Sequence, residues 1–201
     1  MKLIIIFSIP LILSSCSFDF MFLYPDKIKY EDEYDFRKIV EYQSKDTLLV
    51  EFNKSHEPHF RVPFDDIVPE IASISDYTAR SIFISNGHKD SLNAWVITPK
   101  VGANGTLLYF LHGNAGNIVS QYQEMIPFVR KGYSAVVLDY SGFGFSTGKA
   151  KRKNVLKDAN VALDYIISDS SLNYNRLLIY GQSLGGHLSA VVATQNQEKI
   201  D

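Results

Sequence analysis

The chain has 201 residues, of which 46% are hydrophobic and 21% are charged, with a formal net charge of −2 and a single cysteine. This length suits one domain or two small ones, and the apolar fraction is ordinary for a globular protein. The near-neutral charge, with Lys and Arg scattered, argues against a nucleic-acid binder. One cysteine excludes an internal disulfide and a cysteine metal cluster.

The N-terminus has the pattern of an export signal. Lys2 precedes a mainly apolar run over residues 3–13, which fits the core of a signal peptide and falls well short of the roughly 20 residues that cross a bilayer. The Leu-Ser-Ser-Cys sequence at residues 13–16 resembles a bacterial lipobox. The resemblance implies that residues 1–15 are removed and that Cys16 becomes a lipidated N-terminus held on a membrane.

The residue after Cys16 indicates which bacterial membrane the lipoprotein reaches. Ser17 is not the aspartate that the enteric sorting rule associates with retention at the inner membrane. The expected location is therefore the cell envelope, with the outer membrane favoured. Two alternatives stay open: a signal peptide cut at a nearby site, and an uncleaved anchor that continues through the aromatic residues up to Leu23.

Two segments of weak structural signal follow. Residues 16–36 are rich in aromatic and acidic side chains and are predicted to be a tether, whose aromatics lie at a lipid interface or pack on the domain. Residues 37–76 contain strand-like runs at 47–52 and around 60–62, interrupted by prolines. We expect this part to be an N-terminal extension packed against the main domain, which occupies residues 77–201.

The main domain alternates strand and helix patterns. A pair of strands with Asn86-Gly87 between them predicts a hairpin. Continuous apolar runs are typical of parallel strands covered on both faces, and segments of 3.6-residue period predict the helices between them. In chain order, the expected elements are strands 80–85, 92–98 and 106–111, helix 119–131, strand 134–138, helix 154–168, strand 176–180 and helix 184–194. This order predicts an α/β fold with a mainly parallel sheet and helices on both faces.

The strongest chemical motif is Gly-Gln-Ser-Leu-Gly at residues 181–185, directly after a predicted strand and at the start of a predicted helix. This is the context of a nucleophile elbow, in which a serine sits on a sharp strand-to-helix turn. A side chain at Gly181 or Gly185 would collide with the adjoining backbone. Ser183 is therefore the candidate nucleophile, and the helix N-terminus favours negative charge developing beside it.

A second motif, His-Gly-Asn-Ala-Gly-Asn at residues 112–117, follows the strand at 106–111. Acyl transfer needs two backbone N–H donors for the developing oxyanion. In this arrangement Leu184, after the nucleophile, supplies one donor and Asn114 supplies the other. His112 precedes the serine in the chain, and a histidine at a strand end more often shapes its loop than acts as the catalytic base.

Together with Asp-Tyr-Ser-Gly-Phe-Gly-Phe-Ser-Thr-Gly at 139–148, these motifs resemble the α/β-hydrolase superfamily over residues 77–196, with the BEM46-like serine hydrolases as the nearest subgroup. The resemblance implies a catalytic triad of a serine, an acidic residue and a histidine. It also implies that the 139–148 loop lies near the site and contributes no member of this triad. Positive φ at Gly142, Gly144 or Gly148 explains its glycines. Asp139 remains a lesser candidate for the triad acid.

The other histidines suggest no further site. His187, four residues after Ser183, is expected to pack against a neighbouring element, and the remaining three lie in the extension or the hairpin. No spacing typical of metal ligands is present, so we predict no metal. A full dinucleotide fingerprint is absent as well, so no cofactor is expected.

The order of the triad bears on activity. In the resembled superfamily the acid and the histidine follow the serine in the chain. Only 18 residues follow Ser183, and the predicted helix at 184–194 takes up most of them. We therefore expect the fold to be incomplete at its C-terminus. The chain alone is expected to show little or no serine-hydrolase activity and, with an unpaired strand edge, to be unstable.

The favoured function is a membrane-anchored serine hydrolase of the esterase, lipase or thioesterase type, acting on a small-molecule or lipid acyl substrate. The alternative is a non-catalytic envelope lipoprotein, or an inactive fragment, that keeps the scaffold. A peptidase would share the elbow and differ in its substrate channel. Neither the substrate nor the oligomeric state can be inferred from these residues.

Overall fold

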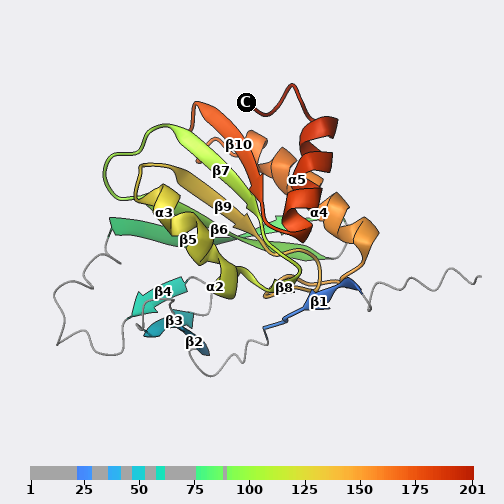
Figure 1. Cartoon of the computed structure of the whole chain (residues 1–201), viewed down its shortest axis with the longest axis horizontal. Coiled ribbons are helices and arrows are strands. Elements are labelled where there is room, and N and C mark those ends of the chain that lie inside the picture. The colour runs from blue at the N-terminus through green and yellow to red at the C-terminus, as the bar shows by residue number, and fades with distance from the viewer. Residues whose placement is uncertain (1–21, 29–35, 42–46, 53–57, 62–75, 88–89) are drawn as a thin grey trace, which may run out of the picture.

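A five-stranded sheet is the centre of the computed structural model, which describes residues 22–28, 36–41, 47–52, 58–61, 76–87 and 90–201 (Figure 1). The strand order is β10-β7-β9-β6-β5. The strands are β5 (Tyr77–Ser85), β6 (Ser91–Pro99), β7 (Thr106–Leu111), β9 (Ser134–Leu138) and β10 (Arg176–Gly181). The predicted hairpin is confirmed, because β5 and β6 pair antiparallel along their full length.

The other half of the sheet is parallel. β7 lies between β9 and β10 and is parallel to both, so that Leu111 is opposite Leu138 on one side and Gly181 on the other. The carboxyl ends of three strands therefore meet at one edge of the sheet. In open α/β sheets this is the edge where ligands bind.

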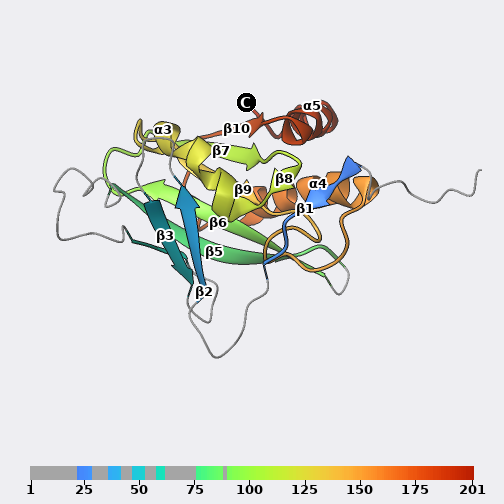
Figure 2. The same cartoon turned by 60° about the horizontal axis from the view of Figure 1, so that its bottom comes forward.

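Helices cover both faces of the sheet (Figure 2). α4 (Arg152–Ser168) and α5 (Leu184–Gln195) lie on one face, while α2 (Ile118–Gln121), the 3₁₀ helix η2 (Tyr122–Met125) and α3 (Ile126–Val129) lie on the other. β7 divides its side chains between two cores. Tyr109 packs among the residues of α4 and α5, and Phe110 packs with the opposite helices. This period of two is why a strand between two helical layers is apolar at every position.

One predicted helix is interrupted. Residues 119–131 were expected to form a single helix, and the structure has α2, η2 and α3 in their place. Pro127 has no amide hydrogen and cannot donate the bond to Gln123 that a continuous helix requires. The start is well defined, because Asn117 caps α2 and exchanges side-chain and backbone hydrogen bonds with Ser120.

The remaining helices match their predictions closely. α4 begins two residues before the expected start at 154, and α5 runs one residue past the expected end at 194. α4 buries the apolar residues on one side, including Ala159 and Leu163, against the sheet. No helix within the described parts of the chain is long and apolar enough to cross a membrane.

The extension contains a second sheet. It is a three-stranded antiparallel sheet of β2 (Phe36–Glu41), β3 (Thr47–Phe52) and β4 (Pro58–Arg61), which lies near β5 and α2. The run at 47–52 was predicted as a strand, whereas β2 was not. Cys16 and the whole export signal lie outside the described residues.

Candidate active site

Ser183 occupies the turn between β10 and α5. Its φ is 52° and its ψ is −114°, and it is the one non-glycine residue with positive φ among the described residues. Such a conformation costs about 1–3 kcal/mol and persists only where the surroundings enforce it. The side chain is exposed. A strained, exposed serine at a strand-to-helix turn has the geometry of a nucleophile elbow.

The glycines on either side of Ser183 are required by close backbone approach. A Cβ at Gly181 would meet the Gly185 carbonyl and the hydroxyl of Ser189. A Cβ at Gly185 would meet the carbonyl groups of Leu111 and His112. The expected collisions are thus confirmed, and the second one has a further consequence. It shows that the start of α5 rests directly on the end of β7.

The elbow and the second motif are hydrogen-bonded to each other. The Gln182 amide donates to the Leu111 carbonyl at 3.2 Å. Gly113 also lies close to the elbow, since a Cβ there would be 3.7 Å from the Gln182 carbonyl oxygen. The Gly113 amide is itself engaged, because it donates to Oε1 of Gln121 at 2.9 Å. Gln121 also donates to the Ala115 carbonyl, so the first turn of the opposite helical layer braces this loop.

The two predicted oxyanion donors lie in these two adjacent segments. Leu184 is the first residue of α5, where backbone N–H groups have no partner within the helix. The Asn114 backbone N–H has no hydrogen bond within the part of the chain that the structure describes. Both amides follow strand ends that β7 and β10 place side by side. The arrangement can accept negative charge from a group bonded to Ser183.

The side chain of Asn114 has a different role. Its Oδ1 accepts a hydrogen bond from the Tyr24 amide at 3.1 Å, and its Nδ2 donates to the Phe22 carbonyl at 2.5 Å. β1 (Tyr24–Pro25) then pairs in parallel with β8 (Ala115–Gly116). The N-terminal segment at residues 22–28 therefore lies along the loop at 112–117, which carries the candidate oxyanion donor Asn114 and which we term the oxyanion loop. The sequence did not predict this contact.

His112 shapes the loop, as expected. The ring is fully buried, with Nδ1 2.7 Å from the Gly113 carbonyl oxygen and Nε2 3.2 Å from Oδ1 of Asp139. The same carboxylate oxygen accepts a hydrogen bond from the Ile118 amide at 2.8 Å. His112 and Asp139 thus join the ends of β7 and β9 to the start of α2, and neither contacts Ser183 through a described hydrogen bond.

The loop at 139–148 turns on its glycines. φ is 84° at Gly142, 47° at Gly144 and 85° at Gly148, as the turn geometry predicted. The buried Asp158 of α4 accepts a hydrogen bond from the Ser141 amide at 2.8 Å. Burial raises the pKa of this carboxyl group, and the hydrogen bonds from Ser141 partly oppose that shift. The loop is therefore fixed to α4 at one end.

The remaining histidines do not supply a base in the described residues. His187 is exposed on α5, so the expectation that it packs against a neighbour was wrong. The side chain of His59 and the whole of His56 and His88 lie outside what the structure describes. No hydrogen bond among the described residues joins the Ser183 hydroxyl to a histidine or a carboxylate. Within those residues, no group of side chains is suited to hold a metal ion.

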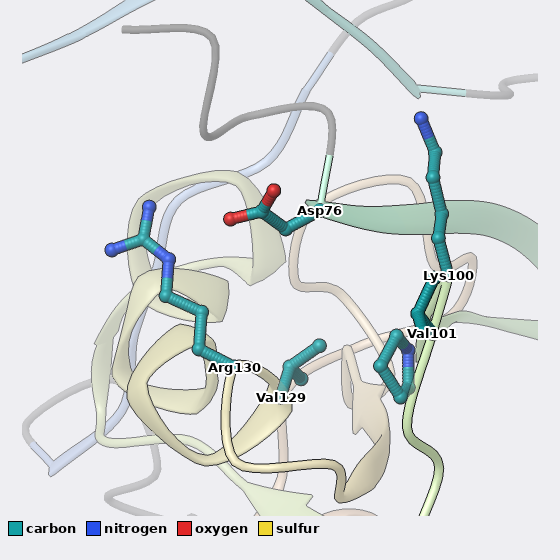
Figure 3. A pocket seen from close by; sticks show the side chains of 6 residues that line it. Asp76, Lys100, Val101, Val129 and Arg130 are labelled. Atoms are coloured by element: carbon teal, nitrogen blue, oxygen red, sulfur yellow. The ribbon is translucent and has the colours of Figure 1, made fainter. Parts of the chain in front are cut away.

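A cavity elsewhere on the domain is unrelated to these motifs. It has a volume of about 410 Å³ and is lined by Asp76, Pro99, Lys100, Val101, Val129 and Arg130 (Figure 3). It lies where β6 ends and α3 stops. Because Ile97 is opposite Ala135 near the start of β9, this is the edge of the sheet opposite the elbow.

Comparison with known proteins supports the same class. Residues 106–201 match the family model described as alpha/beta hydrolase fold. The esterase Est1E from Butyrivibrio proteoclasticus, solved with ferulic acid bound, superposes with a TM-score of 0.52 over 59% of this chain and 49% of that one, at 21% identity. The domain has the α/β-hydrolase fold, and the resemblance inferred from the motifs is confirmed.

Two curated relatives are similar in sequence. The alpha/beta hydrolase domain-containing protein WAV2 of Arabidopsis thaliana is 29% identical over 59% of this chain and 39% of its own length. The protein bem46 of Schizosaccharomyces pombe is 34% identical over 47% of this chain and 32% of its own length. The chain thus spans well under half of the length of these two relatives.

Proposed function

We propose that Ser183 is the nucleophile of a serine hydrolase that acts on ester, thioester or similar acyl bonds. The observation that carries this proposal is the strained backbone of Ser183 at an exposed turn. A serine with no chemical role would gain stability from a relaxed conformation. Glycines at 181 and 185 let the start of α5 pack closely on the carbonyl groups of Leu111 and His112, and this close packing surrounds the strained turn.

In the proposed reaction, the Ser183 oxygen attacks the acyl carbon and its proton passes to a base. The backbone amides of Leu184 and Asn114 then stabilise the oxyanion of the tetrahedral intermediate. The leaving group departs to give an acyl-serine, which water hydrolyses. Because His112 is buried against Asp139, we place the base outside the described residues.

Chemical rescue tests this proposal. The purified 201-residue chain is treated with a fluorophosphonate probe, with and without imidazole as an external base, and Ser183→Ala is the control. We expect negligible labelling of the chain alone and clear labelling of Ser183 once imidazole is added. Ser171→Ala is the matched control, because this exposed serine precedes β10 whereas the elbow follows it, and its loss should not affect labelling.

Two results would count against these expectations. Equal labelling without imidazole would show that the chain already has a base and would contradict the expected inactivity. An absence of Ser183 labelling under both conditions would contradict the nucleophile. It would favour the alternative, a non-catalytic envelope lipoprotein that keeps the scaffold, for which the lack of a described base at Ser183 is the specific support.

We also propose that Cys16 carries acyl chains and holds the protein in the cell envelope, with the outer membrane favoured by Ser17. In a bacterial host, an alkyne-labelled fatty acid should be incorporated into the wild-type protein and not into Cys16→Ser. Recovery of the label in the Cys16→Ser variant would exclude this site. Membrane fractionation would then test the outer-membrane location.

A further inference from the structure

The turn that leads into α4 has an unusual concentration of positive charge. Lys149, Lys151, Arg152 and Lys153 lie within five consecutive residues. Lys151 is the N-cap residue, it makes no side-chain capping bond, and the first turn of the helix contains no acidic residue. The N-terminus of a helix carries a positive partial charge, so cations there oppose helix formation. The stability of the fold therefore does not account for them.

The lysines of this turn, Lys149, Lys151 and Lys153, form no ion pairs with the described residues. Lys149 and Lys153 are exposed and Lys151 is partly exposed. The nearby carboxylates are those of Asp26, Asp90 and Asp158, and Asp90 lines a pocket together with Lys153. The carboxyl group of Asp26 accepts a hydrogen bond from the Asn117 side chain at 3.1 Å, and Asp158 is buried.

Two exposed aromatic side chains lie beside this turn. Burial alternates along residues 22–24 of the N-terminal segment. Leu23 is buried in the core at 5% exposure, while Phe22 and Tyr24 remain 53% and 62% exposed. The ring of Phe22 contacts the guanidinium of Arg152 at 4.2 Å. Phe22, Tyr24 and the cations at 149, 151, 152 and 153 together form what we term the basic–aromatic face.

This face lies on the same side of the molecule as the candidate site. The Tyr24 amide is hydrogen-bonded to the side chain of Asn114, and Figures 1 and 2 both show β1 next to β8 and near the start of α4. A partner bound to the face would therefore adjoin the loop that provides an oxyanion donor. A surface that binds lipid there would place Ser183 close to acyl substrates.

We propose that the basic–aromatic face docks on an anionic phospholipid membrane. Clustered lysines and arginines are attracted to acidic lipid headgroups, and aromatic rings favour the interface between headgroups and acyl chains. The alternative partner for such a cluster is a nucleic acid, and the vesicle experiment includes it as an outcome. The proposal is independent of acylation at Cys16 and of catalysis by Ser183, since it concerns described side chains outside both.

Vesicle binding by the full chain tests the proposal. The chain carries Cys16→Ser, which prevents acylation, and is titrated with vesicles of phosphatidylcholine alone and with vesicles containing phosphatidylglycerol. The apolar run at residues 3–13 is present in every sample, so the quantity measured is the ratio of the two affinities. We expect this ratio to exceed tenfold at low ionic strength and to fall as salt is added.

Charge and ring variants identify the surface. Each lysine near an anionic membrane contributes about fivefold in affinity, so Lys149→Gln/Lys151→Gln/Lys153→Gln should lower binding to the anionic vesicles by up to about 100-fold. This variant removes cations from a helix N-terminus, so its fold should be kept or stabilised. Phe22→Ser/Tyr24→Ser should weaken binding by about tenfold through lost apolar contact.

The matched control removes three cations from the opposite edge of the sheet. Lys100→Gln/Lys131→Gln/Arg176→Gln changes the net charge equally, and these exposed residues lie away from the face. We expect less than a threefold effect. An equal loss in both triple variants, or no preference for anionic vesicles, would overturn the proposal. Displacement of the chain from vesicles by single-stranded RNA at equal phosphate concentration would also overturn it, in favour of a nucleic-acid partner.

Discussion

The two segments that carry the candidate oxyanion donors are built in different ways. The elbow at 181–185 is defined by its own residues, because two glycines allow α5 to turn back onto β10 and β7. The loop at 112–117 has few internal supports and depends on partners outside itself. These are Gln121, Asp139 and the N-terminal segment at 22–24. A local motif can therefore specify one half of this site, whereas tertiary contacts specify the other.

The largest effect is expected at the elbow, where the tolerance for a side chain is least. Gly185→Ala would push a methyl group into the carbonyl groups of Leu111 and His112. We expect a loss of about 3 kcal/mol or more in the free energy of unfolding, measured by urea titration with the fluorescence of the buried Trp95 as the probe.

Gly186→Ala is the matched control for that substitution. Its methyl group would lie 3.3 Å from the Gly181 carbonyl oxygen, its nearest neighbour, at a position without positive φ. The higher helix propensity of alanine, worth about 1 kcal/mol, offsets this tight contact. We expect stability within about 1 kcal/mol of wild type. Equal losses at both positions would mean that the approach of α5 to β7 is not the limiting contact.

The 112–117 loop is expected to be most sensitive to loss of the buried carboxylate of Asp139, which follows β9. Asp139→Ala would leave the Ile118 amide without its acceptor and the buried His112 ring without a charged neighbour. An unsatisfied buried donor costs about 1–3 kcal/mol, so we expect a destabilisation of about 2 kcal/mol, measured by thermal or urea unfolding. A neutral result would show that water replaces the carboxylate without loss.

Asn114→Ala separates the loop from the N-terminal segment. Two hydrogen bonds to residues 22 and 24 would be lost, at about 1 kcal/mol each, while the backbone donor stays in place. We expect faster amide hydrogen exchange confined to residues 22–28 and the 112–117 loop, with little change at β9. Asn154→Ala is the control, since among the described residues its side chain bonds only the Lys149 carbonyl. Uniformly faster exchange across the sheet would contradict a local role.

The smallest effect concerns the strained residue itself. Glycine adopts a positive φ without strain, so Ser183→Gly removes the backbone strain that Ser183→Ala retains. The gain from relief is about 1–3 kcal/mol, and the greater unfolded-state freedom of glycine removes roughly 0.5–1 kcal/mol of it. The glycine variant should therefore be about 1 kcal/mol more stable than the alanine variant in urea titrations. A less stable glycine variant would show that the turn is not strained.

Much of the fold could be predicted because its signals are local. The apolar runs at 106–111 and 134–138 became strands with those bounds, and the elbow lies between strand and helix as its glycines require. The prediction of one continuous helix at 119–131 was wrong, because Pro127 interrupts the hydrogen bonds that such a helix needs. β2 was missed because its residues mix charged and apolar types without clear alternation.

The contacts of residues 22–28 could not have been predicted. Their partners are the side chain of Asn114, the carbonyl of Gly144 and the ring-facing Arg152, all more than 80 residues away in the chain. No period or motif encodes such pairings. The interpretation of Lys and Arg as scattered overlooked the cluster at 149–153, because acidic residues elsewhere balance it in the net charge of the whole chain. The structure was needed to show that this cluster lies beside exposed aromatic side chains on one surface.

The side chain of Asn114 has a mechanical consequence. Its two hydrogen bonds, together with the contact between Phe22 and Arg152, are the first described links between the domain and the chain that precedes residue 22. A pulling force applied to that preceding chain would thus act first on the 112–117 loop and on the start of α4. The loop that would hold a reacting oxygen is also one of the two points at which the domain bears tension.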